Sequence, residues 1–208
     1  MWTGTEFEVD ICFIRHGLTK SNELHRYLSF TDEPLSQAGR ERILLTASTE
    51  SFPKCDALFT SSLIRTVETA KLIYGDFPLV MINDFDEIDF GDFEGFTYEE
   101  LKDNILYRKW LDSNCESQIP NGEKKSDFIN RQLQGLSKVL FQSRDNKQIS
   151  VVCHGGTIMS IFSSFLEGDY YSYSVPNGDF MSAHICYQIL ENRDAKISRF
   201  SLNDRHDS

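Results

Sequence analysis

Short apolar segments alternate along the chain with longer segments of helical period. The short ones are rich in β-branched and aromatic residues, which is typical of buried strands. They occupy residues 9–14, 56–61, 79–82, 149–153, 183–190 and 196–202. This alternation predicts an α/β fold: a three-layer α/β/α arrangement around a mostly parallel central sheet.

The first two predicted helices follow the first two strands. One runs from about residue 37 to 49 with Ser36 as its N-cap, and the other spans 63–74 with apolar residues at Leu63, Val67, Ala70 and Ile73. Thr97 and Glu100 have the spacing of a capping box and predict a third helix, which carries Tyr107 and Trp110. We expect residues 96–125 to form a helical insert that covers a functional site.

Two further helices are predicted in the second half of the chain. The most regular apolar stripe predicts one that packs a single face on the sheet, and the other begins after His154. The stripe consists of Ile129, Leu133, Leu136 and Leu140, and the later helix carries Ile158, Ile161, Phe162 and Phe165.

Length and composition predict one ordinary globular domain over residues 1–208. The 208 residues contain 40% hydrophobic and 25% charged side chains, with no repeat, low-complexity tract or linker. These values exclude a disordered tail protein, a collagen and a disulfide-stapled miniprotein.

The formal net charge of -11 predicts which partners the chain avoids. An acidic surface repels nucleic acid and anionic lipid, so an anionic substrate needs a local cationic pocket. We expect neither export nor membrane insertion, because the N-terminal segment is acidic and no 18 apolar residues occur in succession. The five widely spaced cysteines include no CxxC pair, which favours reduced thiols and a cytoplasmic location. No heptad pattern favours a particular oligomeric state.

Basic residues follow the predicted strands at positions where ligands collect. Arg15 and His16 follow the first strand, Arg65 lies after the second, and His154 follows the fourth. The carboxyl ends of parallel strands meet at one edge, so these side chains should converge. Guanidinium groups match phosphate oxygens, and a helix beginning at Gly155 offers free backbone N–H groups to an anion. The pattern therefore predicts a phosphoryl-binding site.

A neutral imidazole in such a pocket is a nucleophile toward phosphorus. Surrounding positive charge would hold His16 neutral and stabilise the transferred group, with no need for a metal or other cofactor. The leaving oxygen needs a proton, and residues 84–95 contain several carboxylates. Composition does not choose among these carboxylates, and a metal site built from them is the alternative.

Six sequence blocks resemble one known family. Residues 13–22, FIRHGLTKSN, resemble the RHGxTxxN signature of the histidine phosphatase superfamily, the phosphoglycerate mutase-like proteins. The resemblance continues, in the family's order, through residues 32–39, 61–70, 87–95, 121–123 and 151–156. It implies a histidine phosphatase fold over most of the chain.

The resemblance also implies roles for individual residues. His16 matches the nucleophile that becomes phosphorylated, and Glu87 matches the acid that protonates the leaving oxygen and then activates water. His154 is implied as both a catalytic and a phosphate-binding residue. Arg15, Asn22 and Arg65 complete the implied phosphate pocket, whereas Asp89, Asp92 and Glu94 are expected to order the loop or face solvent.

Some positions depart from the family's pattern. Leu28 and Ser29 stand where many members have Gln-Gly, so substrate contacts there are open. Lys124 replaces a frequent serine and is expected to face solvent, and Cys153 is expected to be a packed strand residue. The aromatic residues Tyr98, Tyr107 and Trp110, and the cluster Tyr170, Tyr171 and Tyr173, either line the pocket or pack in the core.

The resemblance implies a metal-independent phosphomonoesterase that acts on a small phosphorylated metabolite through a phosphohistidine intermediate. A sugar phosphate, phosphoglycerate or the nucleotide-loop phosphate of cobalamin synthesis would each fit. Phosphoryl transfer of the phosphoglycerate mutase type is one alternative, and a non-catalytic module that binds a phosphorylated ligand is another.

Overall fold

The computed structural model describes residues 5–49 and 52–203 and contains one six-stranded sheet. The strand order is β3-β2-β4-β1-β5-β6, and β5 runs antiparallel to both of its neighbours while the other pairings are parallel. This confirms the predicted α/β fold and mostly parallel sheet. Within the described residues, no helix has the length and apolar character needed to cross a membrane. The strands are β1 (Glu6–Arg15), β2 (Ala57–Thr60), β3 (Leu79–Met81), β4 (Gln148–Cys153), β5 (Phe180–Ile189) and β6 (Ala195–Leu202).

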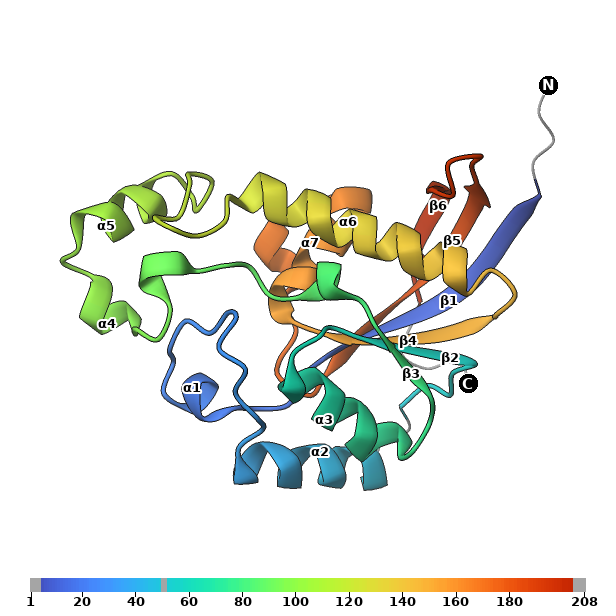
Figure 1. Ribbon diagram of the computed structural model, residues 1–208, viewed down its shortest axis with the longest axis horizontal. Helices are drawn as coiled ribbons and strands as arrows, with labels where there is room; N and C mark the ends of the chain where they lie inside the picture. Colours follow the sequence, from blue (N-terminus) through green and yellow to red (C-terminus); the bar gives the residue numbers. More distant parts are fainter. Residues whose placement is uncertain (1–4, 50–51, 204–208) are drawn as a thin grey trace.

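Helices cover both faces of the sheet, which completes the three layers (Figure 1). The helices α2 (Gln37–Thr49) and α3 (Ile64–Tyr74) lie on one face, and α6 (Lys125–Gln142) and α7 (Gly155–Phe165) lie on the other. Alternate side chains of a strand point to opposite faces, so β1 and β4 contribute to both cores. Toward α6 and α7 they contribute Ile11, Phe13, Ile149 and Val151, and toward α3 they contribute Cys12, Ile14 and Val152.

The start of α2 agrees with the prediction, and the predicted stripe of α6 is confirmed at Leu136 and Leu140 but not at Ile129 and Leu133. The hydroxyl oxygen of Ser36 accepts a hydrogen bond from the Gly39 N–H at 3.0 Å, as an N-cap does. In α6, Ile129 and Leu133 of the predicted stripe are only half-buried. The helix is turned so that Gly135 meets Phe85, whose ring lies 2.8 Å from where a Cβ would stand. The buried face is Lys125, Phe128, Gln132, Gly135, Leu136, Val139 and Leu140.

The buried face of α3 is also more polar than predicted. Arg65, Thr66 and Thr69 are buried there, and Val67 is only half-buried. The polar side chains make hydrogen bonds that satisfy them: the Thr69 hydroxyl, for example, accepts from the Gly17 N–H at 3.0 Å. This face of α3 therefore supports the turn after β1 rather than only the apolar core.

The insert consists of two short helices where the sequence predicted one. The capping box of Thr97 and Glu100 is confirmed, but it begins only α4 (Tyr98–Leu101). Asn104 then caps α5 (Ile105–Asp112), because its Oδ1 accepts from the N–H groups of Leu106 and Tyr107. A small apolar cluster joins the insert to the preceding loop: Phe93, Leu101, Tyr107, Trp110 and Ile119. The insert projects from one end of the sheet (Figure 1).

Candidate active site

Two strand-to-helix turns bring the two predicted histidines together. Strands β1 and β4 are neighbours, and their register pairs Arg15 with Cys153. The next residue of each strand is a histidine, so His16 and His154 emerge side by side at the carboxyl ends. Their rings lie 5.1 Å apart between centroids at an interplanar angle of 63°. The predicted convergence of these residues is confirmed.

The hydrogen bond of His16 fixes which ring nitrogen is free. Its Nδ1 lies 2.7 Å from the carbonyl oxygen of Gly17, and a carbonyl can only accept, so Nδ1 carries the proton. In the neutral ring, Nε2 then holds a lone pair. Burial lowers the pKa of His16 well below its usual value, and the charges of Arg65 and Arg15 lower it further. His16 is therefore a neutral imidazole with an available Nε2.

Two arginines beside the histidines are held by backbone carbonyls rather than by carboxylates. Arg15 donates from Nη1 to the Val175 carbonyl at 2.7 Å. The fully buried Arg65 donates to the carbonyls of Thr31 at 3.0 Å and Ser29 at 2.8 Å. Neither makes an ion pair with a carboxylate within residues 5–49 and 52–203. Their positive charge is thus oriented but not neutralised.

Several buried polar nitrogens at this site have no partner in the described part of the chain. They are the Nε atoms of Arg15 and Arg65 and Nδ1 of His154. The other ring nitrogen of His154 lies 2.8 Å from the Ser61 hydroxyl. Burial, followed by Arg65, lowers the pKa of His154 well below its usual value. Buried polar groups are rarely left unpaired, and the two guanidinium donors fit an anion such as a phosphoryl group.

Glu87 lies on the loop before the insert and reaches the N-terminus of α7. Its Oε2 accepts from the Gly156 N–H at 3.4 Å, and its Oε1 accepts from its neighbour Ile88 at 3.0 Å. Burial raises the pKa of Glu87, and this exceeds the lowering by Arg15 and Arg65. A Cβ at position 156 would stand 2.2 Å from Oε1, so any larger residue there would displace the carboxyl group. The carboxyl group is thus placed to act as an acid.

Arg131 of α6, which the sequence analysis did not identify, fixes the backbone leading to Glu87. Its Nη1 donates to the carbonyls of Asp84 and Asp86, each at 2.9 Å. Its other nitrogens form a two-point pair with Glu123 at 2.7 and 3.0 Å. The predicted Asn121–Glu123 block therefore acts on the site through Arg131. No periodicity in α6 singles out this arginine, because its partners are distant backbone atoms.

Asn22 lines the same cavity and has a structural role as well. It is the last side chain of a capping box that begins the short α1 (Lys20–Glu23). Its Oδ1 accepts from the Thr19 N–H and from the Asn177 amide, each at 3.2 Å. Since Oδ1 serves the fold, Nδ2 is the atom that Asn22 can offer to a ligand.

A cavity of about 400 Å³ opens between these residues and the insert. His154 and Arg65 are fully buried and lie behind its wall. Much of the wall is apolar, and the cations at its surface are Arg15, Arg26 and Lys125. The lining side chains include Asn22, Tyr27, Leu28, Glu87, Ile88, Phe90, Trp110, Leu111, Met159, Tyr170 and Tyr171.

The lysine at the cavity is Lys125, the neighbour of the one considered from the sequence. Lys124 is exposed, as expected, whereas Lys125 is buried. Its Nζ pairs with Glu116 at 2.6 Å and lies 4.3 Å from the centre of the Tyr170 ring. Helix α6 begins at Lys125, so the first helical side chain turns inward and the preceding one faces solvent.

The other positions singled out from the sequence take different roles. Leu28 lines the cavity, and the Ser29 carbonyl holds Arg65. Tyr107 is fully buried, with its hydroxyl 2.7 Å from that of Tyr27, while Tyr98 is exposed and lies outside this cavity. Trp110 both packs in the insert cluster and lines the cavity.

The remaining carboxylates and Cys153 are structural, as predicted. Asp89 accepts from the Gly91 N–H, Asp92 pairs with the Asn121 amide, and Glu94 accepts from the N–H groups of Ser29 and Thr31. Cys153 is fully buried, and burial raises its pKa well above the usual value. It is therefore a neutral thiol.

Two curated proteins that are similar in sequence to this chain are both named as phosphatases. A curated Bacillus subtilis protein, "Uncharacterized phosphatase PhoE", is 32% identical over 165 residues, which are 76% of this chain and 78% of that protein. "Phosphoserine phosphatase 1" of Hydrogenobacter thermophilus is 25% identical over 184 residues, which are 85% of this chain and 87% of that protein.

Solved structures show the same fold. A putative alpha-ribazole-5'-P phosphatase from Escherichia coli superposes with a TM-score of 0.77 at 23% identity, over 95% of this chain and 97% of that chain. A phosphoserine phosphatase from Entamoeba histolytica, solved with 3-phosphoglyceric acid, gives a TM-score of 0.68 at 25% identity, over 95% and 98%. Residues 11–197 match the sequence model described as "Histidine phosphatase superfamily (branch 1)". With its two histidine turns at adjacent strand ends, the chain belongs to the histidine phosphatase superfamily.

Proposed function

We propose that this chain is a metal-independent phosphomonoesterase that forms a phosphohistidine on His16. The observation that carries the proposal is the tautomer of His16. Its Nδ1–H donates to the carbonyl oxygen of Gly17, so Nε2 keeps its lone pair. Unpartnered guanidinium donors of Arg15 and Arg65 and an unpartnered ring nitrogen of His154 accompany this nucleophile. This combination suits attack on a bound phosphoryl group.

In the first step, Nε2 of His16 attacks phosphorus in line with the leaving oxygen. The N–P bond forms and the P–O ester bond breaks. The two guanidinium groups, the Asn22 amide and His154 stabilise the charge on the three equatorial oxygens. The carboxyl group of Glu87 gives its proton to the leaving oxygen, and its raised pKa keeps that proton available. The products are an alcohol and phosphorylated His16.

In the second step, water attacks the phosphohistidine. The Glu87 carboxylate takes a proton from the water as the O–P bond forms. The P–N bond breaks and its electrons return to Nε2. Inorganic phosphate leaves, and both Glu87 and His16 regain their starting states. Neither step requires a metal ion, because the arginines supply the positive charge.

We further propose that the preferred substrate carries a flat apolar group. The cavity beyond the phosphate pocket is walled by Tyr27, Phe90, Trp110 and Tyr170, with Leu28 beside them. A flat apolar group in this cavity would bury its surface and stack on the aromatic rings of the wall. We place the reaction in the cytoplasm, where the five cysteines stay reduced.

The test is phosphate release from purified protein in the presence of a chelator. The substrates are naphthyl phosphate, p-nitrophenyl phosphate, 3-phosphoglycerate, phosphoserine and an alkyl phosphate. Wild type should release phosphate, with the highest kcat/KM for the naphthyl ester, and His16→Ala should release none. The control His25→Asn changes an exposed histidine with φ of 54°, a conformation that asparagine tolerates, and should retain activity.

Two results would overturn the proposal. One is phosphate release by His16→Ala. The other is chelator inhibition that a divalent ion reverses. Acid-quenched protein incubated with radiolabelled substrate should carry acid-labile, base-stable phosphate in wild type and none in His16→Ala, which tests the intermediate directly. No release from any substrate would favour a binding role.

A further inference from the structure

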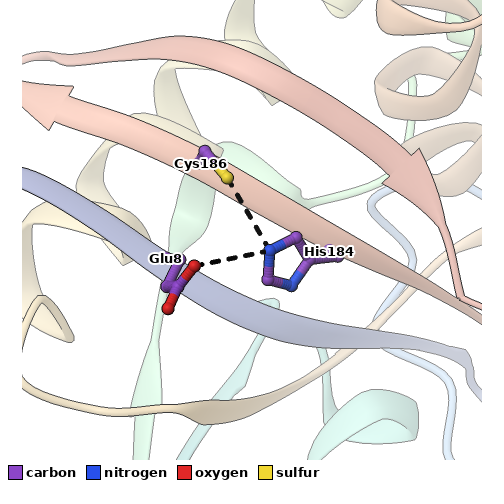
Figure 2. Close-up of side chains that lie close together, drawn as sticks. All are labelled: Glu8, His184 and Cys186. Atoms are coloured by element: carbon purple, nitrogen blue, oxygen red, sulfur yellow. Dashed lines mark hydrogen bonds and ion pairs between the residues drawn. The ribbon is translucent and has the colours of Figure 1, made fainter.

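A second cluster of reactive side chains lies on β1 and β5, away from the proposed active site. Antiparallel pairing places Glu8 directly opposite Cys186 and Asp10 directly opposite His184. Residues two apart on a strand share a face, so all four side chains lie on one face of the sheet. Figure 2 shows Glu8 and Cys186 directed toward the same nitrogen of His184.

The hydrogen bond of His184 prepares that nitrogen for a ligand. Its Nδ1 lies 2.9 Å from Oδ1 of Asp10, and a carboxylate only accepts, so Nδ1 carries the proton. Nε2 then keeps a lone pair in the neutral ring. It lies 3.7 Å from the Cys186 sulfur and 3.9 Å from Oε2 of Glu8. A carboxylate behind a histidine in this way is the usual support of a metal-binding imidazole.

We propose that Glu8, His184 and Cys186 bind one Zn²⁺ through Oε2, Nε2 and Sγ, with water as the fourth ligand. The three donor atoms lie within 4.8 Å of one another. Tetrahedral zinc with usual bond lengths separates a nitrogen and a sulfur ligand by about 3.6 Å, and a nitrogen and an oxygen ligand by about 3.4 Å. The observed separations exceed these by about 0.1 and 0.5 Å, and rotation of the exposed Glu8 side chain removes the larger excess.

The charges around the cluster suit a divalent cation. Glu6, Glu8 and Asp10 follow one another on the same face of β1, so the face carries three carboxylates. Arg199 of β6 also reaches the cluster, and its Nη2 donates to the Cys186 sulfur at 3.0 Å. Zinc takes up the thiolate form of a cysteine, so its binding releases the thiol proton to solvent. The mixed N, S and O donor set favours zinc over magnesium or calcium.

The proposed site is separate from the phosphatase chemistry. Glu8 precedes Arg15 by seven residues along β1, which is about 23 Å at the rise of an extended strand. Zinc would instead join β1, near the start of the chain, to β5, near its end. The sequence analysis expected no metal site and gave His184 no role, because the signal is split between two strands distant in sequence.

The test uses the whole chain, stripped of metal and kept reduced. Co²⁺ is the probe, because four-coordinate cobalt with a thiolate ligand gives visible bands and a near-ultraviolet charge-transfer band. Wild type should bind one equivalent with both features, and Zn²⁺ should abolish them. Cys186→Ser and His184→Gln should lose them, and Asp10→Asn should weaken binding about 10- to 100-fold. The controls Cys55→Ser and His25→Asn should bind as wild type does.

The absence of a charge-transfer band in wild type would overturn the proposal, as would a band that persists in Cys186→Ser. Cys186 is buried, so its substitution risks misfolding. His184 is only half-buried, and His184→Gln tests the site independently: a wild-type band in this variant also overturns the proposal. Phosphate release by His184→Gln should equal that of wild type.

Discussion

Replacing Gly156 by alanine displaces the proposed acid and leaves the nucleophile in place. The added Cβ would stand 2.2 Å from Oε1 of Glu87 and 2.9 Å from the Phe128 ring. An ordinary carbon–oxygen contact is about 3.3 Å, so the carboxyl group must move by about 1 Å. The end of a flexible side chain can move in this way, whereas the backbone of α7 stays where its hydrogen bonds hold it.

This displacement sets the size of the expected effect. A misplacement of about 1 Å in a catalytic group costs about 100-fold in rate, which corresponds to about 2.7 kcal/mol in the activation free energy. The loss should appear in kcat/KM for an alkyl phosphate, whose leaving oxygen needs a proton. With p-nitrophenyl phosphate the leaving group is a weak base, and the rate should change little.

Two comparisons make the assay specific for Glu87. Added to Glu87→Gln, the Gly156→Ala substitution should cost nothing further, because both act on one group. The neighbouring Gly155→Ala places its Cβ 3.2 Å from Cζ of Arg15 and should slow both substrates equally. Equal losses for the two substrates in Gly156→Ala, or an additive loss in the double variant, would refute the reasoning. The added Cβ also meets the Phe128 ring, so thermal unfolding followed by circular dichroism measures how far that contact destabilises the variant.

Three further substitutions test other parts of the site. Arg131→Met should lower the unfolding free energy by about 1–3 kcal/mol in urea titrations and slow alkyl phosphate hydrolysis; Arg131→Lys should fail to restore either, since it lacks the two-point geometry. Lys125→Met should raise KM for 3-phosphoglycerate about tenfold, the loss of one charge-assisted hydrogen bond, and leave KM for naphthyl phosphate unchanged in steady-state assays. Burial lowers the pKa of His154 in the folded state, so the stability that depends on its neutral form is fully present above pH 6.5 and is lost as the pH falls below 6.5. In urea titrations below that pH, the unfolding free energy of wild type should fall by up to about 1.4 kcal/mol per pH unit more than that of His154→Gln.

The sequence predicted the elements whose patterns are local. The strands were recognisable because β-branched runs such as residues 149–153 are buried on both faces. The histidine turns followed from where those strands end. The strand order was not predictable, because it depends on pairings between distant segments. The break in the insert lies at the polar residues Lys102, Asp103 and Asn104, a local turn signal that the prediction of a single helix missed.

Errors within the helices have a common physical cause. The apolar stripe of α6 suggested Ile129 and Leu133, but close packing of Gly135 on Phe85 rotates the helix. The same rotation brings Arg131 to the loop carbonyls and Lys125 to the cavity. Steric fit between a glycine and a ring over 50 residues of separation is a tertiary property, which helical periodicity does not contain.

The position of β4 between β1 and β2 has a consequence for biosynthesis. Strands β1 and β2 are made early but cannot complete their pairing until β4 is synthesised, about 90 residues after β2. Parallel pairing between distant segments is slow to form, and an unfinished sheet exposes strand edges. His16 and Arg65 therefore remain in an incomplete, hydrated environment on the ribosome, and His16 becomes buried only after β4 has been made. The anion-binding site is therefore assembled late in synthesis, although His16 belongs to one of the first segments made.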